Sequence, residues 1–103
     1  MAKPKKLILV TAEHHPLHKA WTRMVEALSS ELGLDFEVKL EDYVFLTKYG
    51  ETDDLGMTWL PQLLVELEDG SIRPLLSEMP LNDAYKADPE KAKEVVKERL
   101  KQL

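Results

Sequence analysis

The sequence predicts an α/β domain built on a mixed four-stranded sheet, and three patterns support this prediction. The apolar run Leu7–Val10 is followed by residues at helical spacing and then by a strand-like alternation, which is typical of a βαβ unit. Asp69-Gly70 separates two further apolar segments and indicates a β-hairpin. A last amphipathic stretch follows Asp88-Pro89. The expected order is strand, helix, strand, short helix, strand, strand, helix, with helices on both faces of the sheet.

The βαβ unit occupies the first part of the chain. Leu7–Val10 is apolar throughout, as expected of a strand that is buried on both faces. Pro16 suits the first position of a helix, because its missing N–H needs no partner there, and Gly33 ends that helix. The helix has one apolar face, formed by Leu17, Ala20, Trp21, Met24, Val25, Leu28 and Leu32. In the second strand, apolar residues alternate with charged ones: Phe36, Val38 and Leu40 with Glu37, Lys39 and Glu41.

The remaining predicted elements are shorter. Asp42 is expected to cap a short helix over Tyr43–Tyr49, and the acidic stretch Glu51–Thr58 is expected to be a loop. The hairpin strands are Leu63–Glu68 and Ser71–Leu76. Pro74 places the second of these at a sheet edge, because proline has no N–H for a neighbouring strand. The last helix has an apolar face formed by Ala92, Val95, Val96, Leu100 and Leu103.

Composition excludes several classes of function. The chain has 103 residues, 44% of them hydrophobic, which predicts a single domain over residues 1–103. A net charge of −5 argues against nucleic acid as a partner, and no apolar run is long enough to cross a membrane. The apolar run after the basic segment Met1–Lys6 is too short for a secretory signal, so we expect a cytoplasmic protein. One asparagine and two glutamines beside many Glu and Lys indicate a heat-adapted source.

Cysteine is absent from the sequence, which excludes disulfides, thiolate catalysis and cysteine-ligated metal. This absence bears on a family resemblance that three segments carry. A strand leads into His-Pro-Leu-His at residues 15–18, and Gly56–Val65 contains a hydrophobic residue, then Pro61, then a strand. A hairpin and a final helix follow. In this arrangement the chain resembles the thioredoxin-like superfamily over about Lys6–Leu103. The resemblance implies a thioredoxin fold with a cis peptide bond before Pro61.

The chain departs from the superfamily at the redox motif. His15 and His18 stand where the superfamily has Cys-x-x-Cys. Thiol–disulfide exchange needs a thiolate that attacks sulfur, and imidazole cannot replace it. Leu9 also stands where many thioredoxins have a buried acidic residue in the first strand. We therefore expect a redox-inactive domain rather than an enzyme. One interpretation is a cysteine-free relative or variant of a thiol–disulfide oxidoreductase.

The leading functional hypothesis is a module that binds a protein or peptide. In the superfamily, the residue before the cis-proline offers its backbone N–H and C=O to an extended peptide, as an added strand would. The resemblance gives this role to Leu60, and Trp59 beside it would form an apolar platform. The alternative for Trp59 is packing against the loop Glu51–Thr58. The predicted binding residues are His14, His15, Pro16, Trp59, Leu60 and Pro61.

A metal site is the second hypothesis. His15 and His18 are three residues apart, so both rings could face the same side of the helix start. The helix N-terminus disfavours imidazolium, and neutral imidazole is the form that binds Zn²⁺, Ni²⁺ or Cu²⁺. Candidates for further ligands are His14, Glu13, and Asp53 or Asp54. The alternative is that the two histidines only cap and pack the helix start, because a pair without a clear third and fourth ligand rarely makes a tight site. Apart from such a divalent metal, no cofactor is expected.

Overall fold

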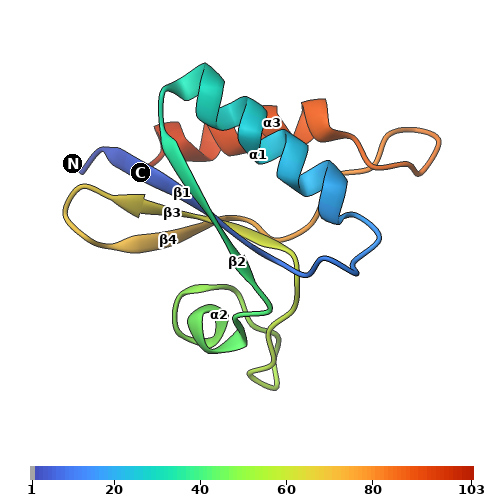
Figure 1. The fold of residues 1–103 in the computed structure, drawn as a ribbon, viewed down its shortest axis with the longest axis horizontal. Helices are drawn as coiled ribbons and strands as arrows, with labels where there is room; N and C mark the ends of the chain where they lie inside the picture. The colour runs from blue at the N-terminus through green and yellow to red at the C-terminus, as the bar shows by residue number, and fades with distance from the viewer. Residues whose placement is uncertain (1) are drawn as a thin grey trace.

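The computed structural model describes residues 2–103, and in that range the chain forms a mixed four-stranded sheet with three helices. The elements are β1 (Pro4–Thr11), α1 (His18–Leu32), β2 (Asp35–Leu40), α2 (Tyr43–Tyr49), β3 (Gln62–Leu67), β4 (Ile72–Leu76) and α3 (Pro89–Lys101). The predicted order of elements is confirmed. Helices α1 and α3 cover one face of the sheet and α2 lies on the other (Figure 1). Within the described range, no helix is long and apolar enough to cross a membrane.

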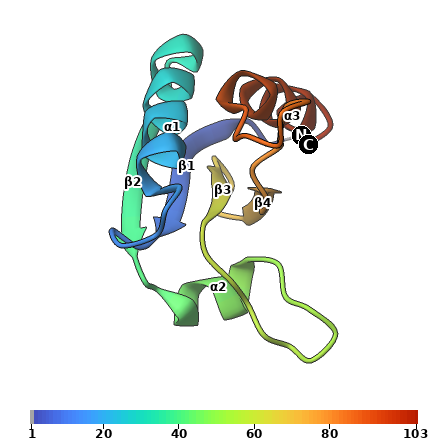
Figure 2. The same ribbon diagram turned by 90° about the vertical axis from the view of Figure 1, so that its right-hand side faces the viewer.

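The sheet has a parallel half and a hairpin half. Its strands lie in the order β2-β1-β3-β4, with β1 parallel to β2 and antiparallel to β3 (Figure 2). The β3–β4 hairpin is antiparallel, and Gly70 in its turn has a φ of 89°, which glycine adopts without strain. Pro74 lies in β4 at the edge of the sheet, as the sequence predicts. The opposite edge is β2.

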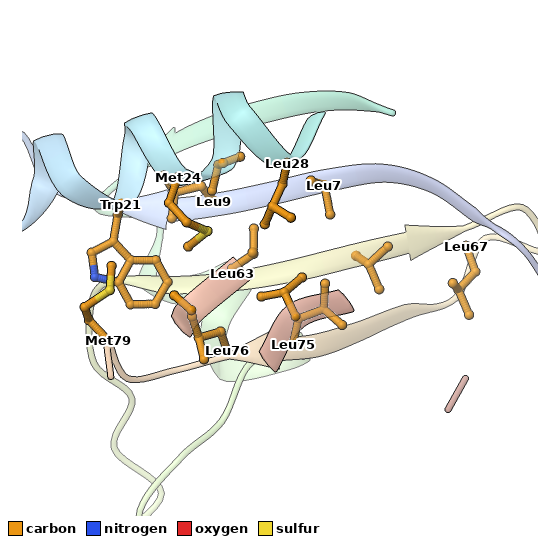
Figure 3. Packing of buried hydrophobic residues seen from close by; sticks show 14 residues of the cluster. Leu7, Leu9, Trp21, Met24, Leu28, Leu63, Leu67, Leu75, Leu76 and Met79 are labelled. Carbon is orange, nitrogen blue, oxygen red and sulfur yellow. The ribbon is translucent and has the colours of Figure 1, made fainter. Parts of the chain in front are cut away.

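Two hydrophobic cores, one on each face, explain why β1 is apolar throughout. Leu7 and Leu9 point into the larger core beneath α1 and α3, whereas Ile8 and Val10 point into a smaller core beneath α2. The larger core also contains Trp21, Met24, Val25, Leu28, Leu63, Val65, Leu75, Ala92 and Val96 (Figure 3). The smaller core adds Leu46 and Leu64. The apolar face of the first long helix is therefore core packing, as its spacing predicts.

Helix α1 begins two residues later than expected. Its N-cap is Leu17 and its first residue is His18, so the prediction that Pro16 is the first helical residue is wrong. The chain instead makes a turn, in which the N–H of His18 donates to the carbonyl oxygen of His15 at 3.0 Å. The other predicted caps are confirmed, since the side chains of Asp42 and Asp88 accept hydrogen bonds at the starts of α2 and α3. The turn changes where the histidine rings point.

Candidate functional site

A surface groove of about 480 Å³ lies where the loop before α1 meets the turn before β3. Its lining includes His15, Leu17, Trp21, Trp59, Leu60 and Pro61. The lining also includes Ser77, Glu78, Met79 and Leu81, which follow β4. The fold thus brings His15 beside Trp59–Pro61, although these segments are far apart in the sequence. His14 and Pro16 are exposed on the loop, outside the residues that line the groove.

The turn at Leu60-Pro61 leaves backbone groups free at the groove. The peptide bond between these residues is cis, which is the conformation the resemblance implies. Pairing between β1 and β3 starts only at Gln62, which lies opposite Val10. Among residues 2–103, neither the N–H nor the C=O of Leu60 has a hydrogen-bond partner. Leu60 thus lines the groove with both of its backbone polar groups unpaired within the described residues.

Trp59 is anchored by a hydrogen bond, and part of its surface stays exposed. Its indole Nε1 donates to the carbonyl oxygen of Ser77 at 2.8 Å, which ties the turn before β3 to the segment after β4. The residue keeps 37% of its surface exposed and lines the groove. Tryptophan with one edge anchored and one face open is a frequent contact residue in binding surfaces. Trp59 thus links the turn before β3 to the segment after β4 and forms part of the groove lining.

Gln62 organises the loop that carries Trp59, a role that no sequence pattern indicates. Its side chain is fully buried, and its Nε2 donates to the Oγ1 of Thr58 and the carbonyl oxygen of Trp59, both at 3.0 Å. The same amide makes two hydrogen bonds to the backbone of Glu51. Gly50 makes room for it, because a Cβ there would lie 2.8 Å from the Gln62 Oε1. Local sequence patterns do not predict this role of the Gln62 amide, because its hydrogen-bond partners lie in the loop that precedes it.

Trp21 forms the inner wall of the groove. Its ring is almost completely buried in the larger core, next to the side chain of Met79 (Figure 3). Within the part of the chain that the structure describes, the Trp21 Nε1 is buried and has no hydrogen-bond partner. An unpaired buried N–H costs free energy, so the position is less stable than a pure hydrocarbon wall would be.

The two histidines of the motif line different hollows. His15 lies in the groove, and its Nδ1 accepts a hydrogen bond from the backbone N–H of Leu17 at 3.0 Å. His18 lies in a separate hollow with Glu13, and its Nδ1 is 3.1 Å from the Oγ1 of Thr11. Each ring therefore already uses one nitrogen in a local contact. Taken over residues 2–103, no group of three or more His, Cys, Asp or Glu side chains is placed to hold a metal ion.

Two surface loops near the groove share one hydrogen-bond pattern. In the first, Asp53 Oδ1 accepts from the backbone N–H groups of Leu55 and Met57. In the second, Asn82 Oδ1 accepts from the backbone N–H groups of Ala84 and Lys86. This second loop starts at Leu81, which lines the groove. Asp53 is thus occupied within its own loop. Both loops contain a residue with positive φ at the equivalent place: Gly56 in the first and Tyr85 in the second.

Comparison with known proteins identifies no relative. No protein-family model, no curated protein and no solved structure matches the chain.

Proposed function

We propose that the chain is a thioredoxin-fold domain without redox chemistry, and that it binds an extended segment of a partner protein in the groove. The observation that carries this proposal is the pair of unpaired backbone groups on Leu60, beside an apolar lining. An extended peptide that pairs with these groups would bind as an added strand does. With no cysteine in the chain, this binding cannot involve a disulfide to the partner.

The arrangement of elements supports the fold assignment. The parallel β1–β2 pair, the antiparallel β3–β4 hairpin and the C-terminal helix occur in the order that the resemblance implies. The cis bond at Leu60-Pro61 precedes β3 and shares a groove with His15, at the position of the redox motif. These features support kinship with thioredoxins in a chain that has lost both sulfurs.

The chemistry of the groove indicates which peptides it would prefer. Leu17, Trp59 and Leu81 offer apolar surface for an aliphatic or aromatic side chain. Glu78 is the acidic group of the lining, and it would favour a basic residue nearby on the peptide. We therefore expect extended peptides that combine an apolar residue with Lys or Arg.

Screening the immobilised chain against a random peptide library tests the proposal. Selected peptides should shift the backbone amide NMR signal of Leu60, and methylation of the peptide nitrogen that pairs there should abolish the shift. Trp59→Ala should weaken binding by about tenfold or more, because anchored aromatic residues dominate such interfaces. Tyr43→Ala is the control, since Tyr43 is a half-exposed aromatic residue of α2 outside the groove lining. Equal effects of both substitutions, or no selected peptide, would contradict the proposal.

Kinship with oxidoreductases has its own test. Residues 15 and 18 are joined by a turn hydrogen bond, which keeps their backbones close together. His15→Cys combined with His18→Cys should form an intramolecular disulfide under mild oxidation, detected by mass spectrometry. Catalysis of insulin reduction by that variant, against no rate for the wild type, would support descent from an active oxidoreductase. A variant that stays in the dithiol form under oxidation would count against it.

A further inference from the structure

The outer edge of β2 is free to pair with another strand. Within residues 2–103, β2 pairs with β1 alone and forms one border of the sheet (Figure 2). The outward N–H and C=O groups of such an edge are a template for a further strand. None of the β2 residues lines the groove of the proposed function, so a contact at this edge is independent of peptide binding in the groove.

One face of β2 carries an incompletely covered apolar row. Phe36 and Val38 lie beside Leu7 and Leu9 in the parallel register, which places them on the same face as α1. They nevertheless keep 39% and 36% of their surface exposed, and Leu40 keeps 50%. A strand added outside β2 would cover these side chains and extend the larger core.

The other face of β2 carries charges that are already neutralised. Glu37 accepts from the Nζ of Lys6 at 2.7 Å and lies 3.2 Å from the Nζ of Lys39. Many exposed edges are protected by charged side chains that repel a partner strand. The β2 edge has no such row of charges of one sign. The alternation of Glu37 and Lys39 also makes the strand complementary to itself.

We propose that two copies of the chain pair through β2, antiparallel, with Val38 on the two-fold axis. In this register Glu37 lies opposite Lys39 of the second copy, and symmetry repeats the pair. Phe36 lies opposite Leu40 of the second copy, so the apolar rows of both chains become continuous. The two sheets join into one across the interface.

Registers centred on Phe36, Glu37 or Lys39 place like charges face to face within β2. An axis at Glu37 or at Lys39 puts each of these residues opposite its own copy. An axis at Phe36 puts Asp35 opposite Glu37. If the register of the two strands is shifted by a single residue, apolar side chains lie opposite charged ones, because side chains alternate between the two faces of a strand. Among the registers that pair at least three residues of β2, charge and polarity favour Val38 as the centre, and they favour a second copy of this chain as the partner. Asp35 then faces Glu41, which follows the end of β2.

Analytical ultracentrifugation with charge-reversed variants tests the pairing. The wild type should show a reversible monomer–dimer equilibrium between about 10 µM and about 1 mM. Glu37→Lys alone sets lysines opposite each other, Lys39→Glu alone sets glutamates opposite each other, and each should raise the Kd about tenfold or more. An equimolar mixture of the two variants restores opposite charges at both pairs and should form heterodimers with an affinity near that of the wild type. Glu13→Lys, an exposed charge reversal outside β2, should leave the Kd unchanged.

Two outcomes would overturn the proposal. One is a wild type that stays monomeric up to about 1 mM. The other is a mixture of E37K and K39E that associates no better than either variant alone. Far-UV circular dichroism and thermal melts of each variant establish that it is folded before the measurement, and the mixture supplies a gain of association that a merely destabilised variant cannot produce.

Discussion

The buried side-chain amide of Gln62 pairs with the backbone of Glu51 in both directions. Its Oε1 accepts from the Glu51 N–H at 2.9 Å, and its Nε2 donates to the Glu51 carbonyl oxygen at 3.1 Å. The amide thus acts as a backbone peptide group would, and it fixes the loop before the cis-proline against β3. The position of Trp59 in the groove depends on this pairing, because the same Nε2 also holds the Trp59 carbonyl oxygen.

Gln62→Leu should therefore reduce the free energy of unfolding by about 2 kcal/mol, since several backbone groups lose a partner inside the protein. Urea denaturation measures this loss. Gln102→Leu is the matched control, because Gln102 is exposed at the end of α3, and its effect should be close to zero. If both substitutions had the same effect, Gln62 would not organise the loop before the cis-proline.

Tyr85→Gly should raise the free energy of unfolding by about 0.5–1 kcal/mol, because a non-glycine residue is strained at positive φ. Tyr85 has a φ of 60° and is 85% exposed, so few contacts are lost with its side chain. The reciprocal change is Gly56→Tyr, since Gly56 has a φ of 79° in the loop with the same hydrogen bonds. This change should lower the free energy of unfolding by a similar amount. Thermal or urea unfolding measures both, and a loss of stability on Tyr85→Gly would contradict backbone strain as the dominant effect at this position.

Glu31 should make folding sensitive to acid. The carboxylate accepts hydrogen bonds from Lys97 at 2.9 Å and Lys93 at 3.2 Å, which joins α1 to α3 and lowers the pKa of Glu31 below its ordinary value of 4.5. A lowered pKa in the folded state stabilises the protein above pH 4.5, and that contribution disappears as the pH falls through the folded-state pKa.

Glu31→Gln should consequently lower the urea midpoint at pH 7, and its difference from the wild type should shrink steadily below pH 4.5. The size of the effect at pH 7 should fall with added salt, as for any exposed ion pair. Glu98→Gln, an exposed glutamate of α3, is the control and should show a smaller dependence on pH. A difference that stays constant down to pH 3 would mean that the carboxylate charge of Glu31 has no part in stability.

Titration with Zn²⁺ or Ni²⁺ distinguishes the metal hypothesis from peptide binding. Because His15 and His18 line different hollows and each Nδ1 has a local contact, their ring NMR signals should not saturate together at micromolar metal. Coupled saturation of both rings, lost in His15→Asn, would instead establish a shared metal site. Exposed His14 provides the internal reference for weak binding to a single imidazole.

The elements that depend on local signals could be predicted from the sequence. The apolar run of β1, the Asp88-Pro89 start of α3 and the proline at the β4 edge all act through the residue itself or its near neighbours. The start of α1 could not be predicted, because a proline at position 16 is compatible both with the first turn of a helix and with the turn that the chain forms there. That turn separates the directions of His15 and His18, which simple helical spacing would have kept together.

The inner structure of the groove could not be predicted in this way. The contact of Trp59 with Ser77 and the role of Gln62 arise between segments that only the folded sheet brings together. The resemblance places His15 beside the cis-proline turn, as the structure does, but the hydrogen bonds that shape the groove depend on loops without a recognisable motif. The unpaired indole N–H of Trp21 is likewise a property of the packed interior.

Pro74 limits how far these sheets can grow. If two copies join through β2, the combined sheet has a β4 strand at each outer border, and each border contains a residue that cannot donate a backbone hydrogen bond. Pro74 at each outer border would then disfavour the addition of a further strand there. A sheet that pairs at its β2 edge and resists pairing at its β4 edge would favour a closed dimer over polymerisation into fibrils.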